Sequence, residues 1–479
     1  MKLGLSRRVF LKGTAAAACS ATLPSNAQSE APVFVYFGTY TDPKPARKGD
    51  GIYGFRIEPG TGAVEYAGSF ASAVNPSFLA LHPNRRALYA VNESSPGAVS
   101  AFSANTETGA LTHMNTRPSL GDRPVHLSVD PTGRFVLVAN DGGTIAVFPV
   151  LSDGSLGEPT DMVRHQGPAG PRAQRQDGPH PQQIITDPAG RYALVTDLGL
   201  DKTLVYALNG DSGTLRLHSE LAAEPGTGPK RIADHPLGRW MYRINELNNT
   251  MTAVEWIAAT GELRNIQSLS TLPESFRGEN GTGQVQVAPY GQFVYGTNLG
   301  DDSIVLFNMD AGTGELTFLA LESSFGETPA FLAIDPAGSF LFAANQESDS
   351  VVQFAMNRRN GRLTATGTKL DLPAPASILF SAPPVGLSSK SGVTLSVFNN
   401  PTYIFDGTGQ VRSSFAWNAP DAAEVEVRVN SPSGPLLGRF PKAAGVTTDK
   451  WVTNGTVFYL QDTAGEALGT VTIDVRTAV

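Results

Sequence analysis

The most regular feature of the chain is a pattern of apolar and polar positions that recurs six times between residues 75 and 346. Each copy has a proline slot, a second proline seven residues later and an Asn or Asp sixteen residues after the slot. The final slot holds Asn92, Asn140, Asp197, Asn245, Asn298 or Asn345. A repeat of roughly fifty residues predicts supersecondary units that bury their apolar faces against neighbouring units.

Each copy is predicted to form an antiparallel hairpin. An apolar or alternating run such as Phe78–Leu81 leads into the turn, and a second β-rich run such as Phe135–Val138 follows it. The turn itself is Asp-Pro-x-Gly or a close variant, in which proline fixes φ and glycine relieves strain.

A second turn, x-Gly-x followed by Val or Leu, alternates with these hairpins. Its seven copies contain Gly62, Gly109, Gly154, Gly213, Gly261, Gly314 and Gly361. Two hairpins per repeat make four strands, which is a propeller blade. Pro375–Phe380 is similar to a first strand and Val33–Tyr40 to a second strand. We therefore predict an all-β fold with a seven-bladed β-propeller whose last blade is closed by both ends, which removes exposed sheet edges.

Beyond about residue 383 the repeat stops and short alternating strands follow. They are expected at Val393–Val397, Ser414–Trp417, Val425–Val429, Trp451–Val452, Val457–Leu460 and Val471–Val475. Such spacing is typical of a small β-sandwich, and the segment resembles the immunoglobulin-like modules of exported bacterial proteins. The alternative is two extra propeller strands and a tail. The predicted domains are residues 28–382 for the propeller and 383–479 for the immunoglobulin-like β-sandwich.

Residues 1–27 have the features of a twin-arginine signal peptide. Arg7-Arg8 is followed by Val-Phe-Leu-Lys, a weakly apolar Ala stretch and a small-x-small site that ends at Ala27. We expect cleavage after Ala27 and a periplasmic or secreted protein. The alternatives are a surface helix at the N-terminus and lipid attachment at Cys19. Cleavage after Ala27 removes the single cysteine, so the mature protein would need no disulfide.

The charge balance narrows the range of partners. Removal of residues 1–27 takes away four positive charges and no acid, so the net charge changes from -8 to -12. An acidic protein without a basic run is a poor candidate for nucleic-acid or anionic-membrane binding. No later segment has the length of a membrane span.

Polar residues are predicted to gather around one mouth of the propeller, because first strands begin and second strands end at the same edge. The positions at the start of first strands include His126, His180, Gln182, Gln183, Lys230, Arg231 and Gln284. The positions after second strands include Glu93, Asp141, Glu246 and Gln346. This ring suits an anionic or polyhydroxylated ligand. It also suits lactone hydrolysis, because a carboxylate or imidazole activates water and a cation stabilises the oxyanion.

Structural roles are open for the same residues. The recurring Asn slots are typical of side chains that satisfy backbone groups at strand ends. His126 and His180 are consistent with hydrogen-bonded core histidines, and Glu246 is consistent with a structural ion pair to Lys230 or Arg231. Asp122-Arg123 and Asp301-Asp302 are interpreted as solvated loop charges. The connection Gln166–Gly178, which contains Arg172 and Arg175, is interpreted as a surface loop or a substrate lid.

Other site classes have little support. The sequence has no His/Cys zinc spacing, Asp-x-Asp calcium loop, Gly-x-Ser-x-Gly motif or nucleotide-binding glycine loop. We expect no cofactor and no metal, although a metal site assembled from distant blades stays open.

The motifs resemble the seven-bladed lactonase propellers, a family that includes a bacterial 6-phosphogluconolactonase and carboxy-cis,cis-muconate cyclase. The resemblance extends from about Val33 to Phe380. Its most informative segments are Phe37–Thr41, Asn75–Leu79, Leu88–Glu93, Gly178–Pro181, Thr196–Asp201, Ile244–Leu247 and Asn298–Ser303.

The resemblance implies a catalytic histidine and glutamate at His180 and Glu246. The chain departs from the family where Gln182 replaces a usual histidine, Lys230-Arg231 replaces Arg-His, and Leu299 replaces a usual arginine. Lysine keeps the positive charge but lacks the bidentate fork of arginine.

Our leading hypothesis is an exported lactonase that hydrolyses a sugar-type or related lactone. Glu246 and His180 would handle protons, Lys230 and Arg231 would polarise the carbonyl, and the other mouth residues would bind substrate. Export favours an unphosphorylated lactone. The alternative is a non-catalytic propeller with a degraded lactonase site that binds a ligand or protein, whose C-terminal module binds a carbohydrate or a surface partner.

Overall fold

The computed structural model describes residues 33–42, 48–58, 60–236, 238–381, 387–390, 393–398, 402–404 and 408–477. The predicted signal peptide and the predicted domain boundary at residues 382 and 383 lie outside the described residues. Every regular element in the described part of the chain is a β-strand. That part contains no apolar helix of bilayer-spanning length.

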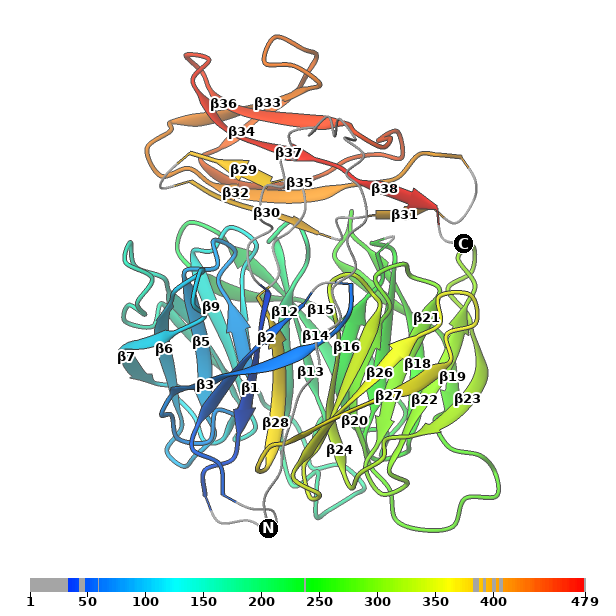
Figure 1. Ribbon diagram of the computed structural model, residues 1–479. Helices are drawn as coiled ribbons and strands as arrows, with labels where there is room; N and C mark the ends of the chain where they lie inside the picture. Colours follow the sequence, from blue (N-terminus) through cyan, green and yellow to red (C-terminus); the bar gives the residue numbers. More distant parts are fainter. Residues whose placement is uncertain are drawn as a thin grey trace, which may run out of the picture. The chain divides into compact units, whose positions relative to one another are not determined.

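Seven four-stranded antiparallel sheets form the blades between Val33 and Phe380 (Figure 1). The first three, each written from its first to its fourth strand, are β4 (Leu79–Leu81), β5 (Ala87–Asn92), β6 (Ala98–Ala104) and β7 (Leu111–Pro118); β8 (Pro124–Val129), β9 (Phe135–Asn140), β10 (Thr144–Pro149) and β11 (Asp161–Arg164); and β12 (Pro181–Thr186), β13 (Tyr192–Asp197), β14 (Lys202–Asn209) and β15 (Thr214–Ala222).

The next three blades follow in chain order. They are β16 (Pro229–Asp234), β17 (Trp240–Asn245), β18 (Thr250–Ile257) and β19 (Glu262–Ser270); β20 (Thr282–Val287), β21 (Phe293–Asn298), β22 (Ser303–Met309) and β23 (Leu316–Ser323); and β24 (Pro329–Ile334), β25 (Phe340–Asn345), β26 (Ser350–Met356) and β27 (Leu363–Asp371). The seventh consists of β28 (Pro375–Phe380), β1 (Val33–Thr39), β2 (Ile52–Ile57) and β3 (Val64–Ala71).

The blades form a closed ring. The first strand of each blade packs against the first strand of the next, and the series returns from β28 to β4. Closure comes from antiparallel pairing of β1 with β28, in which Phe37 lies opposite Ile378. Figure 1 shows this pair as a blue strand beside a yellow one. The predicted seven-bladed all-β propeller and its closure by both ends are confirmed.

The apolar core lies between blades rather than inside any one of them. One cluster joins Tyr89 and Val91 of β5 to Val136 and Val138 of β9 in the next blade, and all four side chains are buried. Because each blade needs its neighbour to bury its apolar face, the repeat is stable only as an array.

The seven x-Gly-x turns connect the third and fourth strands and link each blade to the one before it. All seven glycines have positive φ, between 68° and 91°. Their carbonyl oxygens accept hydrogen bonds from side chains of the preceding blade, namely Gln353, Tyr36, Tyr89, Thr160, Ser219, Tyr242 and Tyr295. A Cβ atom on Gly314 would lie 2.6 Å from the ring of Trp240. Both the backbone conformation and the close approach therefore require glycine.

Replacing one of these glycines should destabilise the propeller more than replacing a glycine with free space around it. Gly314→Ala would add a left-handed backbone penalty of about 1–2 kcal/mol and an overpacking penalty of about 1–3 kcal/mol. Gly238, in the same blade as Trp240, also has positive φ, but a Cβ atom added there would meet nothing within 4 Å, so Gly238→Ala should incur only the first penalty. Chemical denaturation measures the unfolding free energy of both variants. Equal losses of unfolding free energy in Gly314→Ala and Gly238→Ala would contradict this role of the turn.

The described residues after Phe380 form separate sheets and do not extend the blades. Their strands are β29 (Leu387–Ser389), β30 (Thr394–Phe398), β31 (Thr402–Ile404), β32 (Ser414–Asn418), β33 (Glu424–Val429), β34 (Leu436–Pro441), β35 (Ala443–Thr447), β36 (Val457–Asp462), β37 (Ala467–Thr472) and β38 (Val475–Thr477). The sheet orders are β29-β37-β36-β33-β34, β30-β32-β35 and β31-β38.

Side chains from the two larger C-terminal sheets share one core. Trp417 and Phe415 of β32 pack in the same cluster as Val427 of β33 and Phe458 of β36. Two details differ from the prediction: Val452 forms only an isolated bridge with Val411, and the strand expected at Val471–Val475 is divided between β37 and β38. The immunoglobulin-like assignment of this module stays a prediction.

Candidate active site

One edge of the ring collects the residues named as site candidates. In each of the seven blades, a main-chain N–H that follows the second strand donates to a carbonyl that precedes the first strand. These bonds are Glu93 to Asn75, Asp141 to Arg123, Leu198 to His180, Glu246 to Gly228, Leu299 to Gly281, Gln346 to Thr328 and Tyr40 to Ala374. We call this edge the mouth. The repeated bond brings strand starts and strand ends together.

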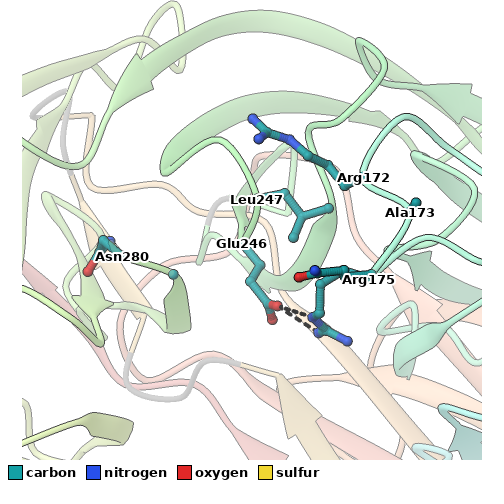
Figure 2. Close-up of a pocket in the computed structure, with 8 residues that line it drawn as sticks. Arg172, Ala173, Arg175, Glu246, Leu247 and Asn280 are labelled. Atoms are coloured by element: carbon teal, nitrogen blue, oxygen red, sulfur yellow. Dashed lines mark hydrogen bonds and ion pairs between the residues drawn. The ribbon is translucent and has the colours of Figure 1, made fainter. Parts of the chain in front are cut away.

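A pocket of about 440 Å³ opens beside Glu246, within the range of roughly 300–1,000 Å³ typical of small-ligand sites. It is lined by Arg172, Ala173, Gln174, Arg175, Glu246, Leu247, Asn280 and Gly281. Figure 2 shows the guanidinium of Arg175 directed at the Glu246 carboxylate, with Asn280 across the pocket. The wall thus combines a strand end of one blade, the start of the next blade and the connection 166–178.

Glu246 is held by two cations. Arg175 donates from Nε (2.9 Å) and Nη2 (2.6 Å) to its Oε1, and Lys230 Nζ lies 2.7 Å from its Oε2. Burial opposes ionisation, but Lys230 and then Arg175 stabilise the anion, so the pKa of Glu246 lies below its usual value. Glu246 is therefore a carboxylate at neutral pH, beside two cationic hydrogen-bond donors.

His180 forms a second cluster with Asp141. Its Nδ1 lies 3.0 Å from the Asp141 carbonyl oxygen and 3.3 Å from Oδ1, and its Nε2 lies 2.7 Å from Oδ1 of Asp177. Hydrogen bonding to Asp141 outweighs burial and, together with Asp177, raises the pKa of His180 to about 9. At neutral pH His180 is an imidazolium, which can donate a proton but cannot act as a base.

Asp141 is the buried centre of this second cluster. Its Oδ1 accepts a hydrogen bond from Gln182 Nε2 at 2.5 Å, and Arg123 forms an ion pair with its Oδ2. Burial raises the pKa of Asp141, but His180 and Arg123 outweigh it and the net direction is downward. Arg123, interpreted as a solvated loop charge, is indeed exposed, with 52% of its side chain accessible, but its guanidinium also pairs with the buried carboxylate of Asp141.

Arg231 and His126 lie away from the pocket. Arg231 extends from β16 across the centre of the ring, where its Nη2 donates to the Val125 carbonyl of β8 (3.1 Å) and its guanidinium lies 5.6 Å from the Phe78 ring centroid. Burial lowers the pKa of Arg231 to about 10, against the opposing effect of Glu93 and other anions. Arg231, predicted to polarise a carbonyl, is therefore not one of the residues that line the pocket.

His126 has the environment of a core histidine. Its ring centroid lies 4.0 Å from that of Phe78, and its Nδ1 accepts a hydrogen bond from the main-chain N–H of Ile184 at 3.3 Å. Burial, with a further contribution from Arg231, lowers its pKa well below the usual value, so the ring is neutral.

The other candidates have separate environments. Gln183 Oε1 accepts a hydrogen bond from the Ile232 N–H at 2.5 Å and so ties β12 to β16. Glu93 accepts a hydrogen bond from the Tyr40 hydroxyl at 2.8 Å. The Oε1 atom of Gln284 is buried and has no partner among the described residues, while Gln346 is fixed at the mouth by its main-chain bond to Thr328.

Sequence reasoning did not assign Arg175 or Asn280 to the site. Arg175 was noted only as part of a long connection, and a pairing with Glu246, which lies in a later blade, has no signal in the repeat pattern. Asn280 lies two residues before β20, next to Gly281, which holds the position that His180 holds before β12, so the frame could have placed Asn280 at the mouth. Asp302, interpreted as solvated, instead accepts a hydrogen bond from the Thr328 N–H at 2.7 Å.

Comparison with known proteins agrees with this architecture. Residues 34–380 match the family model described as lactonase, 7-bladed β-propeller. The chain belongs to this family. It is 35% identical to a 6-phosphogluconolactonase of Bacillus subtilis over 304 residues, which cover 63% of this chain and 84% of that protein.

Two solved structures that are similar to this chain also carry lactonase names. A periplasmic gluconolactonase of Pseudomonas aeruginosa is 29% identical, with a TM-score of 0.68 over 74% of this chain and 100% of that chain. A putative 6-phosphogluconolactonase from Bacteroides fragilis is 28% identical, with a TM-score of 0.68 over 74% of this chain and 99% of that chain.

At the mouth, the positions where this chain departs from the usual lactonase pattern have structural consequences. Lys230 retains an ion pair with Glu246, and Arg175 adds a guanidinium on the same carboxylate, so the site keeps a cationic partner despite Leu299. Within the described residues, no group of three or more His, Cys, Asp or Glu side chains is arranged to hold a metal.

The His180 cluster predicts a specific pH dependence of stability. Because the pKa of His180 is raised from 6.5 to about 9, its stabilising contribution should be complete below pH of about 6.5 and should be lost as the pH rises through about 9. The difference in unfolding free energy between wild type and His180→Gln should shrink across this window. A difference that stays constant from pH 6 to pH 9.5 would contradict the assignment.

Proposed function

We propose that the protein is an exported lactonase that opens the ring ester of a sugar-type or related lactone in the mouth pocket. The observation that carries this proposal is the ionised Glu246 at the pocket wall, held between Lys230 and Arg175. Membership of the lactonase family and the names of its relatives support the same reaction class.

The proposed reaction is addition of water followed by cleavage of the ring C–O bond. Glu246 accepts a proton from water as the water oxygen bonds to the lactone carbonyl carbon. Lys230 and Arg175 donate hydrogen bonds to the oxyanion that forms. When the ring C–O bond breaks, the imidazolium of His180, which lies in the Asp141 cluster at the same mouth, gives its proton to the departing alkoxide oxygen. The product is a hydroxy acid, and the proton held by Glu246 then returns to His180 through water, which restores both groups.

The proposed substrate class follows from the pocket and from export. Arg172 and Gln174 offer hydrogen-bonding groups for hydroxyls, while Leu247 offers an apolar wall. A phosphorylated sugar lactone is normally a cytosolic metabolite, so the twin-arginine signal predicted at residues 1–27 favours an unphosphorylated aldonolactone. The name of the periplasmic gluconolactonase relative is consistent with such a substrate.

Activity on aldonolactones tests the proposal directly. The mature protein should hydrolyse at least one member of an aldonolactone panel faster than buffer alone, and Glu246→Gln should lower kcat by about 10²- to 10⁴-fold. Glu255→Gln is the matched control, because Glu255 lies in the same blade and is also paired with two cationic side chains, Arg239 at 2.8 Å and Arg264 at 3.5 Å. This control should keep wild-type kcat.

Two outcomes would defeat the enzyme proposal. One is a rate equal to spontaneous hydrolysis for every lactone. The other is an equal rate in wild type and Glu246→Gln, with folding of both verified by circular dichroism. Calorimetric binding of a lactone without turnover would favour the binding propeller with a degraded site instead.

The export proposal has its own test. In a host with a working twin-arginine pathway, the mature N-terminus of the periplasmic protein should begin at Gln28. An Arg7→Lys, Arg8→Lys double substitution should reduce the periplasmic fraction by about tenfold, because the pathway reads the arginine pair. Undiminished export of the double variant would contradict the twin-arginine assignment.

A further inference from the structure

The connection 166–178 folds around one buried side chain. Gln176 is 0% exposed. Its Nε2 donates to the Leu198 carbonyl at 2.9 Å, and its Oε1 accepts a hydrogen bond from the Arg172 N–H at 3.2 Å. Its main-chain carbonyl accepts a hydrogen bond from Gly170. The segment that carries Arg172 and Arg175 is thus attached to the blade from within.

The two ends of this connection meet at a single buried carboxylate. His165, directly before the connection, places Nδ1 2.6 Å from Oδ2 of Asp197. The other oxygen, Oδ1, accepts hydrogen bonds from the main-chain N–H groups of His180 (2.8 Å) and Leu200 (3.0 Å). Both side chains of the His165–Asp197 pair are 0% exposed. Asp197 therefore fixes the connection on both sides.

The hydrogen-bond pattern defines which nitrogen of His165 faces Asp197. The carboxylate of Asp197 only accepts, so Nδ1 carries a hydrogen and donates to it. The hydroxyl of Tyr206, which can donate or accept, lies 3.1 Å from Nε2 of His165. Each polar group of the chain Tyr206–His165–Asp197 is satisfied, which is the condition for stable burial of a carboxylate.

This arrangement explains why the final slot of the repeat, at the end of the second strand, holds Asp only at Asp197 and Asn in the other five copies. In three other blades, the slot amides Asn140, Asn298 and Asn345 donate to the carbonyls of Ser119, Thr271 and Ser324, which directly follow the fourth strand of the preceding blade. His165 occupies the same place after β11 but presents a ring N–H. With a hydrogen on Nδ1, the slot side chain accepts rather than donates, and a carboxylate does so without a change of tautomer at His165.

We propose that Asp197 and His165 are positioning residues that hold the connection 166–178 in place, so that Arg175 lies on Glu246 and His180 lies beside Asp141. The catalytic part of this inference rests on the proposed lactonase function. The structural part does not, because the same pair should also control how often the connection opens. On this account the connection is a fixed wall of the pocket and not a lid.

Limited trypsin digestion tests the structural part without any substrate, since Arg172 and Arg175 are cleavage sites within the connection. Asp197→Ala leaves His165 and two N–H groups unpaired, and cleavage at these arginines should become about tenfold to a hundredfold faster. Asp187→Ala is the matched control: Asp187 is a buried carboxylate of the same blade that accepts hydrogen bonds from the Arg191 and Tyr192 N–H groups. It should not accelerate cleavage there.

Asp197→Asn should restore the slow cleavage. The Asn oxygen can accept from the two N–H groups, and its NH₂ can donate to Nδ1 if His165 moves its hydrogen to Nε2 and Tyr206 becomes the acceptor. In the lactone assay, kcat/KM should fall by about tenfold or more in Asp197→Ala and recover in Asp197→Asn, provided the wild type is active. If Asp197→Ala does not fold, His165→Ala, which removes one of the three bonds, should show the same faster cleavage.

Cleavage of Asp197→Ala or His165→Ala at the wild-type rate, or equally fast cleavage in Asp187→Ala, would overturn the proposal. If trypsin shows the predicted opening while wild type hydrolyses no lactone, the proposed function is wrong, but the proposal that Asp197 and His165 hold the connection 166–178 in place survives. If wild type is active but opening of the connection leaves kcat/KM unchanged, the positioning role is wrong although the enzyme proposal survives.

Discussion

Each blade of this propeller is held by the blade before it, and the series has no free end because β1 pairs with β28. The turn glycines accept hydrogen bonds from the preceding blade, and apolar clusters span neighbouring blades. A displaced blade would therefore expose apolar surface on both sides. Ring closure also brings the starts of the first strands and the ends of the second strands together at one edge, the mouth, where residues from distant blades meet.

Two carboxylates at the mouth are each stabilised by two cationic groups. Glu246 has Lys230 and Arg175, while Asp141 has Arg123 and the imidazolium of His180. Burial alone would raise the pKa of either acid, and the paired cations reverse the direction. The charges that ester hydrolysis needs are thus present before a ligand arrives, so little reorganisation would accompany the reaction.

The fold was readable from the sequence because proline and glycine act locally. The turn at Gly314 requires glycine because of its own backbone conformation. Pro236 marks a hairpin turn in the same local way. Lys230 and Glu246 were placed together because they belong to one hairpin. Arg175 was not, since its position depends on a connection without a repeat pattern. Arg231 was misplaced because its contacts, the Val125 carbonyl and the Phe78 ring, come from other blades and have no signal in the repeat pattern.

The most direct test of this account is a crystal structure of the mature protein with an aldonic acid, the product class of the proposed reaction. The account predicts that the carboxylate of the product lies in the pocket beside Glu246, within hydrogen-bond distance of Lys230 Nζ and the Arg175 guanidinium. An aldonic acid bound at the opposite edge of the ring, or only to the C-terminal module, would contradict it.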